Sequence, residues 1–163
     1  MAAGATPAIR ALVAAGSRHT VHSYDHDPRA GTYGGEAVDV LVARLGVEPR
    51  QIFKTLVLEL STGALAVAVL PVPDTLSLKA AAAALGAPKA VMADRIRAER
   101  GTGYVLGGIS PLGQRTRHPT VVDESALGWD RVLCSAGRRG LEIEVAPAEL
   151  IRLTAAVTAA VTA

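Results

Sequence analysis

The sequence predicts a single α+β domain in which a mixed, barrel-like β-sheet is flanked by helices. Its 163 residues are close to the usual size of one domain. Half of the residues are hydrophobic and a fifth are charged, which is typical of a protein with a globular core. Helical and β-rich segments alternate irregularly and several of the latter form hairpins, which argues against a doubly wound parallel sheet. We therefore expect residues 1–163 to form one domain without an internal linker.

Capping residues mark where the predicted helices begin and end. Thr6 and Pro7 supply an N-cap and a first-turn proline, and Gly16 is placed to end that helix. The segment Arg29–Gly35 contains three glycines and predicts a mobile loop before the second helix. We expect helices over Pro7–Ala15, Glu36–Leu45, Ser77–Leu85 and Asp94–Arg100, and a last helix that begins at Pro147.

Runs of aliphatic and β-branched residues bounded by turn residues mark the strands. The clearest pair is Phe53–Leu60 and Ala64–Leu70, which flank Ser61-Thr62-Gly63 and predict a buried hairpin. The remaining runs predict strands over His19–Tyr24, Ala90–Met92, Tyr104–Leu106, Thr120–Asp123, Arg131–Ser135 and Leu141–Val145. We expect Ala136–Gly140 to join the last two strands.

Composition excludes several classes of protein. The single cysteine cannot form an internal disulfide, and the N-terminus lacks the charged flank and apolar run of a secretory signal, so a cytoplasmic location is expected. The longest apolar stretches fall short of the roughly 18 residues that cross a bilayer. A net charge of +2 argues against bulk coating of nucleic acid, although the arginines are clustered.

Lys54 lies between Phe53 and Leu56 in a strand whose residues are nearly all aliphatic. Strand alternation allows it to face water, which is the usual environment of lysine. The alternative is a side chain that points into a cavity, where an ammonium group requires a carboxylate or an anionic ligand as its partner. Both interpretations remain open from the residues alone.

A glycine-rich segment, residues 101–108, is similar to a dinucleotide-binding fingerprint. Its third glycine comes one position late and no helix is predicted to follow, so we reject that assignment. A phosphate-binding loop of the Walker type is absent as well. What remains is a turn over residues 107–111, whose bare backbone amides could approach a carbonyl or phosphate. The alternative is an ordinary bulge or barrel corner.

Four potential metal ligands, His22, Asp25, His26 and Asp27, lie close together in the sequence. The two histidines would share a face only on a helix, whereas this segment is predicted to be a strand and a turn, so we expect no metal site. A metal hydrolase that uses His22, His26 and Asp27 is kept as an alternative.

No side chain has the sequence context of a catalytic nucleophile. Cys134 follows Val132 and Leu133, which predicts a small buried residue and an unreactive thiol. Ser110 and Ser135 lack the G-x-S-x-G context of a hydrolase serine.

Four segments together resemble the YbaK/EbsC family. They are Tyr24–Pro28, Phe53–Leu56, Thr102–Gln114, which contains GGISPLGQ, and Ser135–Glu144. The resemblance runs from about Thr6 to Leu153. It implies a mixed barrel-like sheet with surrounding helices, the fold of the editing insertion of bacterial prolyl-tRNA synthetases. It also implies an enzyme that deacylates Cys-tRNA(Pro), or Cys-tRNA(Cys), and that needs no cofactor.

The resemblance also implies the site residues. Lys54 matches the essential lysine of the family, and Tyr24 matches a second position that we assign to catalysis. The substrate-binding positions that it implies are Gly107, Gly108, Ile109, Ser135 and Glu142. Family mechanisms are substrate-assisted, with the substrate's own thiol, a tRNA hydroxyl or water as the attacking group. This agrees with the lack of a candidate nucleophile.

Three departures from the family pattern bear on selectivity. Glu142 replaces an aspartate of close relatives, Ala136 replaces a frequent glycine, and Arg29–Gly35 is a longer loop. The extra methylene of Glu142 can shift a carboxylate by roughly 1 Å. The amino acid removed is therefore open, with alanine and serine as alternatives to cysteine.

The expected partners are the acceptor end of tRNA(Pro) and prolyl-tRNA synthetase, and no membrane. Four arginines are plausible contacts for the acceptor stem, with a merely solvated face as the alternative; they are Arg115, Arg117, Arg138 and Arg139. An alternative in a different class is a non-catalytic module that binds aminoacyl-tRNA or prolyl-tRNA synthetase.

Overall fold

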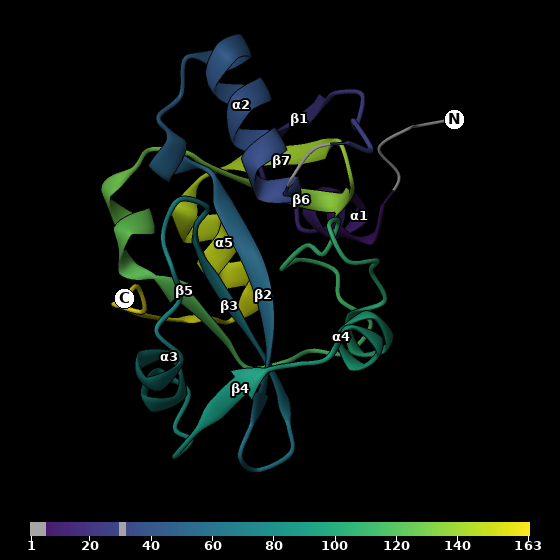
Figure 1. Ribbon diagram of the computed structural model, residues 1–163. Helices are drawn as coiled ribbons and strands as arrows, with labels where there is room; N and C mark the ends of the chain where they lie inside the picture. The colour runs from purple at the N-terminus through teal and green to yellow at the C-terminus, as the bar shows by residue number, and fades with distance from the viewer. Residues whose placement is uncertain (1–5, 30–31) are drawn as a thin grey trace.

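The computed structural model describes residues 6–29 and 32–163, whose strands form two sheets (Figure 1). The three-stranded sheet has the order β1-β7-β6, and both of its pairings are antiparallel. Its strands are β1 (His19–Ser23), β6 (Val132–Arg138) and β7 (Leu141–Val145). The β6–β7 hairpin contains a register shift between Ser135 and Arg138, which is a β-bulge.

The five-stranded sheet has the order β4-β2-β3-β5-β8. Its strands are β2 (Phe53–Leu60), β3 (Leu65–Pro71), β4 (Ala90–Met92), β5 (Thr120–Asp123) and β8 (Val157–Ala159). The pairs β2–β3 and β2–β4 are antiparallel, whereas β3–β5 and β5–β8 are parallel, so the predicted mixed sheet is confirmed.

The described strands do not close on themselves, so the barrel-like character of the predicted sheet is not confirmed. The two sheets meet where Ile52, just before β2, forms a parallel bridge with Leu133 of β6. Both side chains are fully buried there. The described strands therefore form two open sheets joined at a corner.

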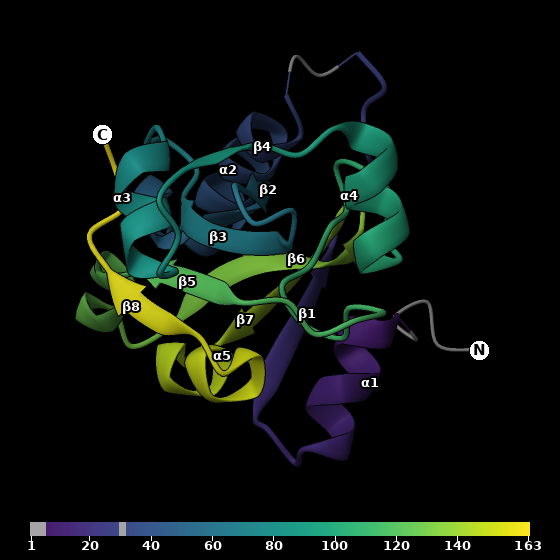
Figure 2. The same ribbon diagram turned by 90° about the horizontal axis from the view of Figure 1, so that it is seen from below.

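Among the described residues, helices flank both sheets (Figure 1). They are α1 (Pro7–Ala14), α2 (Tyr33–Leu45), α3 (Leu78–Ala84), α4 (Arg95–Thr102) and α5 (Pro147–Thr154), with short 3-10 helices η1 (Pro49–Gln51) and η2 (Glu124–Gly128). The side chains of Thr6, Ser77 and Asp94 accept the backbone amides that the sequence predicts them to cap. In two perpendicular views, α3 and α4 lie on opposite sides of the β2–β3 hairpin (Figures 1 and 2).

Some element predictions need correction. Tyr104–Leu106 is not a strand, because buried Tyr104 donates its hydroxyl to the Leu112 carbonyl at 2.6 Å and the chain turns at once. Helix α2 begins at Tyr33, capped by Thr32, so the end of the predicted mobile loop is helical. Residues 30 and 31 of that loop lie outside the described residues. The bulge carries β6 on to Arg138, and β8 was not predicted.

The core is aliphatic and lies in three groups of buried side chains. The largest joins α1, α5 and the inner faces of both sheets, and a second lies between α3 and the five-stranded sheet. The third places Ala37 and Leu41 of α2 against Ile52 and Leu133, so α2 rests on the corner between the sheets. Among the described residues, no helix has the length and apolar character needed to span a membrane.

The turn between β6 and β7 constrains the position of Tyr24. Gly140 has a φ of +79°, and a Cβ there would overlap the Tyr24 carbonyl oxygen. In Gly140→Ala the new methyl group must push Tyr24 away from the turn. We expect this overlap to lower the free energy of unfolding by about 1–3 kcal/mol, in addition to the loss from the strained backbone. Urea unfolding followed by circular dichroism measures the loss.

The matched control is Gly86→Ala. Gly86 has a similar φ of +74°, but a Cβ there would have no heavy atom within 4 Å. This variant should show only the strain of a left-handed backbone, about 1–2 kcal/mol. Equal losses in the two variants would contradict a packing role for Gly140.

Candidate active site

A cavity of about 450 Å³ opens at the corner between the two sheets, beneath the first turn of α2. Strand β4 pairs with β2 only from Leu58 onward, so the first half of β2 presents an edge to this cavity. The walls come from α2, β2, β6, β7 and the turn after α4. They include Tyr24, Thr32–Ala37, Ile52–Leu56, Val72, Leu106, Gly107, Ile109, Ser135, Arg139, Gly140 and Glu142.

Lys54 lies in the cavity wall, so the structure supports the cavity interpretation of this residue. Its Nζ donates a hydrogen bond to the main-chain oxygen of Asp74 at 2.6 Å. An ammonium group has three donors, which leaves two for a ligand. Burial lowers the pKa of Lys54, and the negative charge of Asp74 opposes that shift. Lys54 therefore supplies a directed, partly desolvated cation.

Tyr24 and Glu142 also line the cavity, and both keep their protons at neutral pH. Burial raises the pKa of Tyr24, and the charges of Glu142 and Glu36 raise it further, so its phenol stays protonated. Glu142 is 6% exposed, and burial raises its pKa to about 8. A carboxyl group with this pKa is mostly protonated at neutral pH and can donate a hydrogen bond.

Ser135 lies directly opposite Glu142 in the β6–β7 register and also lines the cavity. Its Oγ accepts the amide of Gly137 at 3.1 Å within the bulge. The hydroxyl hydrogen can still be donated elsewhere. The hydrogen bond within the bulge therefore orients the Ser135 side chain and leaves its hydroxyl hydrogen available for a ligand.

The predicted glycine turn contributes unequally to the site. Gly107 and Ile109 line the cavity, whereas Gly108 is not among the lining residues. The amide of Gly108 donates to the Val105 carbonyl at 2.9 Å. A Cβ on Gly108 would lie 2.9 Å from the Arg138 Cα. Gly108 is thus a point of close backbone packing behind the wall, and its amide is occupied by the turn.

Tyr33 and Arg139 line one side of the cavity, which we call its mouth, and His26 packs against Tyr33. The Arg139 guanidinium lies 4.5 Å from the centroid of the Tyr33 ring, and its Nη2 donates to the Leu106 carbonyl at 2.6 Å. The His26 ring lies 5.6 Å from Tyr33 and bonds Glu36 at 2.7 Å. These contacts connect the first turn of α2 to the glycine turn across the opening.

The four predicted tRNA-contacting arginines are not gathered at one place. Arg139 is at the mouth, and Arg138 is exposed beside it. Arg115 reaches the carbonyl of Arg100 at the end of α4, and exposed Arg117 lines a separate cavity of about 270 Å³. Of the four, Arg139 lines the cavity and Arg138 is its exposed neighbour in the sequence.

The candidate metal ligands and the cysteine have other surroundings. His22 pairs with Glu144 at 2.8 Å, and His26 pairs with Glu36. Within residues 6–29 and 32–163, no three His, Cys, Asp or Glu side chains gather as a metal site would require. The prediction that Cys134 is buried is confirmed, and burial raises the pKa of its thiol far above the ordinary value.

Sequence reasoning did not select Thr55, which also lines the cavity. Its Oγ1 is buried and has no hydrogen-bond partner among the described residues. Successive residues of a strand point to opposite faces, so the sequence does not predict that Lys54 and Thr55 line the same cavity. Both reach the cavity because it opens at the edge of β2.

The fold and the cavity define a small α+β domain with a pocket that presents hydrogen-bond donors at the corner of its two sheets. Residues 34–153 match the family model described as "Aminoacyl-tRNA editing domain". The chain belongs to this family, as its resemblance to YbaK/EbsC proteins indicates.

Relatives of known sequence and structure agree with this assignment. An Enterococcus faecalis protein named "Putative Cys-tRNA(Pro)/Cys-tRNA(Cys) deacylase EbsC" is 41% identical over 110 residues, which cover 68% of this chain and 67% of that protein. A solved structure of "a putative trans-editing enzyme for prolyl tRNA synthetase" superposes with a TM-score of 0.84 at 26% identity, covering 100% and 99% of the two chains. The hypothetical protein APE2540 gives 0.82 at 26% identity, covering 97% and 100%.

The raised pKa of Glu142 makes stability depend on pH. Between its ordinary pKa of 4.5 and about 8, the folded state keeps a proton that the unfolded chain has released. The free energy of unfolding should therefore fall as pH rises through this window, by up to about 1.4 kcal/mol per pH unit from this group. Urea midpoints at several pH values measure the slope.

Glu142→Gln is the matching variant, because glutamine keeps the shape of the carboxyl group and does not titrate. It should remove this part of the slope between pH 5 and 8. A wild-type slope that Glu142→Gln leaves unchanged would show that Glu142 is ionised in the folded protein.

Proposed function

We propose that this chain is a trans-acting deacylase that removes cysteine from mischarged tRNA(Pro). Membership of the editing family supports cleavage of an aminoacyl ester, and the named Enterococcus faecalis relative suggests cysteine as the amino acid. The observation that carries the proposal is the Lys54 ammonium, held at a cavity wall with two donors to spare. The chain acts in the cytoplasm, where tRNA is charged.

The cavity can hold an esterified adenosine by donating hydrogen bonds to it. Lys54 can donate to the ester carbonyl or to the terminal phosphate, where negative charge is present or develops in the transition state. Tyr24 and Ser135 offer neutral donors, and the backbone at Gly107 and Ile109 closes one side. The role of these residues is to orient the ester and to stabilise its charge.

The attacking group comes from the substrate or from solvent. Cys134 cannot attack, because its thiol is fully buried and protonated. A cysteinyl ester carries its own thiol, which can attack the ester carbonyl while the tRNA oxygen leaves with the proton. We infer that this substrate-assisted step is the reaction, and that selectivity for cysteine follows from it.

The tRNA approaches along the mouth, where Arg138 and Arg139 can contact phosphates of the acceptor end. Prolyl-tRNA synthetase is the natural partner, because it releases the mischarged tRNA that this enzyme would edit.

Glu142 is a buried acid of the cavity wall, and its protonated form favours an uncharged amino-acid side chain beside it.

Replacing Lys54 tests the central role of the ammonium. Lys54→Ala should lower kcat/KM for deacylation of Cys-tRNA(Pro) by roughly 10²–10³-fold, the usual cost of losing one electrostatic donor at a developing charge. Release of labelled cysteine over time measures the rate. Activity close to wild type in this variant would defeat the proposal.

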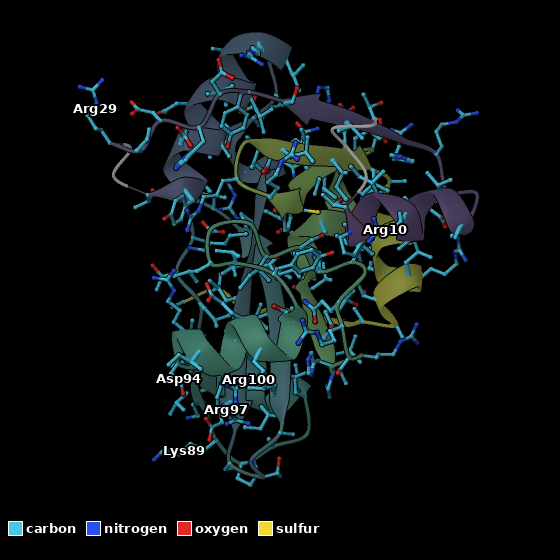
Figure 3. All side chains as sticks on the ribbon, turned by 90° about the vertical axis from the view of Figure 1, so that its right-hand side faces the viewer. Arg10, Arg29, Lys89, Asp94, Arg97 and Arg100 are labelled. Atoms are coloured by element: carbon cyan, nitrogen blue, oxygen red, sulfur yellow. The ribbon has the colours of Figure 1, made fainter. Side chains whose placement is uncertain are left out.

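Lys89→Ala is the matched control. Lys89 is exposed and extends from the end of the molecule opposite Arg29 and α2 (Figure 3). The same charge is removed far from the cavity, so the rate should change by less than about twofold. A large loss here would indicate that overall charge, rather than Lys54 itself, governs the reaction.

A second experiment tests the attacking group. The same tRNA(Pro) is charged with cysteine or with serine, which differ by one sulfur atom. If the substrate thiol attacks, the cysteinyl ester should be cleaved at least about a hundredfold faster, because a neutral hydroxyl is a much weaker nucleophile than a thiol. Equal rates would assign the attack to water or to a tRNA hydroxyl.

A further inference from the structure

Lys54, near the start of β2, and Arg50, in η1, both contact Asp74, which follows β3. The Lys54 Nζ binds the main-chain oxygen of Asp74 at 2.6 Å. The carboxylate of Asp74 is instead ion-paired with Arg50 through Oδ1. Its second oxygen, Oδ2, is buried and has no hydrogen-bond partner among the described residues. One aspartate thus holds Lys54 by its backbone and Arg50 by its side chain.

Short, constrained segments hold this arrangement in place. The amide of Asp74 donates to the Pro71 carbonyl at 3.0 Å, and the amide of Val72 donates to Ile52 at 2.8 Å. Pro71 and Pro73 each fix a backbone φ angle within this turn. Arg50 belongs to η1, which precedes β2. The segments before β2 and after β3 therefore converge on Lys54.

The pairing of the carboxylate decides how much charge Lys54 can offer. Asp74 lies next to Lys54, since its main-chain oxygen accepts the hydrogen bond of the ammonium, and its negative charge raises the pKa of Lys54. If the carboxylate turned to Lys54, the two charges would neutralise each other, and the ammonium would lose a donor that the substrate needs. The ion pair with Arg50 prevents this, while the main-chain contact keeps Lys54 oriented.

Stability alone does not explain the ion pair. The Arg50 side chain is 53% exposed, and ion pairs this accessible add about 0–1 kcal/mol. A buried oxygen without a partner is moreover a cost to folding. The arrangement is better explained by what it does for Lys54.

We propose that Arg50 is a positioning residue, which holds the Asp74 carboxylate away from Lys54 so that the full ammonium charge is available to the aminoacyl ester. This inference rests on the proposed deacylase function and names a further determinant of it. Arg50 acts through Asp74 and does not touch the substrate.

The test is a double-mutant cycle in Cys-tRNA(Pro) deacylation under single-turnover conditions. Arg50→Ala should lower the rate at saturating enzyme by roughly tenfold, since the freed carboxylate competes for Lys54. In an Asp74→Asn background, which keeps the main-chain oxygen but has no charge to release, the same arginine replacement should cost less than twofold. Arg50→Lys should keep most of the rate, because lysine can still pair with Asp74. Urea unfolding of each variant confirms that it is folded.

Two results would overturn the inference. One is wild-type activity in Arg50→Ala. The other is an equal loss from Arg50→Ala with and without the Asp74 charge, which would mean that Arg50 contacts the tRNA directly. Failure of the proposed function is distinguishable from both, because it appears as an inactive wild-type protein or as undiminished activity in Lys54→Ala.

Discussion

The site depends on one hydrogen bond, from the Lys54 ammonium to the main-chain oxygen of Asp74. A lysine in an aliphatic strand would normally extend into water, where its charge is screened and its position is averaged over many rotamers. The first half of β2 lacks the β4 partner that its second half has, so the side chain can turn into a cavity at that edge. The carbonyl then gives it a direction without cancelling its charge. The proposed role of the cavity in binding an ester rests on this oriented ammonium group, which keeps two donors for a ligand.

The remaining polar groups of the cavity complement that cation. Tyr24 is a protonated phenol, and Glu142 is a carboxyl group that burial keeps largely protonated at neutral pH. A carboxylate at Glu142 would add a negative charge to the cavity wall, whereas a neutral carboxyl group can donate a hydrogen bond. The cavity therefore offers mostly donors, which suits the carbonyl and phosphate oxygens of an aminoacyl-adenosine and requires no side-chain nucleophile.

Local signals predicted much of the fold, and contacts between distant segments explain the rest. Thr6, Ser77 and Asp94 cap their helices as expected, because capping depends only on residues three positions away. The prediction of a strand over Tyr104–Leu106 is wrong, because apolar residues suggest a strand, whereas the chain turns here and the Tyr104 hydroxyl bonds the Leu112 carbonyl. The corner between the sheets includes the bridge Ile52–Leu133, which joins residues far apart in the sequence and has no local signature.

The same distinction explains which site residues the sequence could reveal. Lys54 stands out as the one lysine in a strand of mostly aliphatic residues, so it draws attention without any structure. Arg50 and Asp74 do not, because an exposed arginine and an aspartate in a proline turn are ordinary at a protein surface. They gain significance only when β2 and β3 pair and bring them to the same end of the hairpin. A residue that acts on the substrate can thus be found from its unusual neighbours, whereas a residue that acts on another side chain is found from the fold.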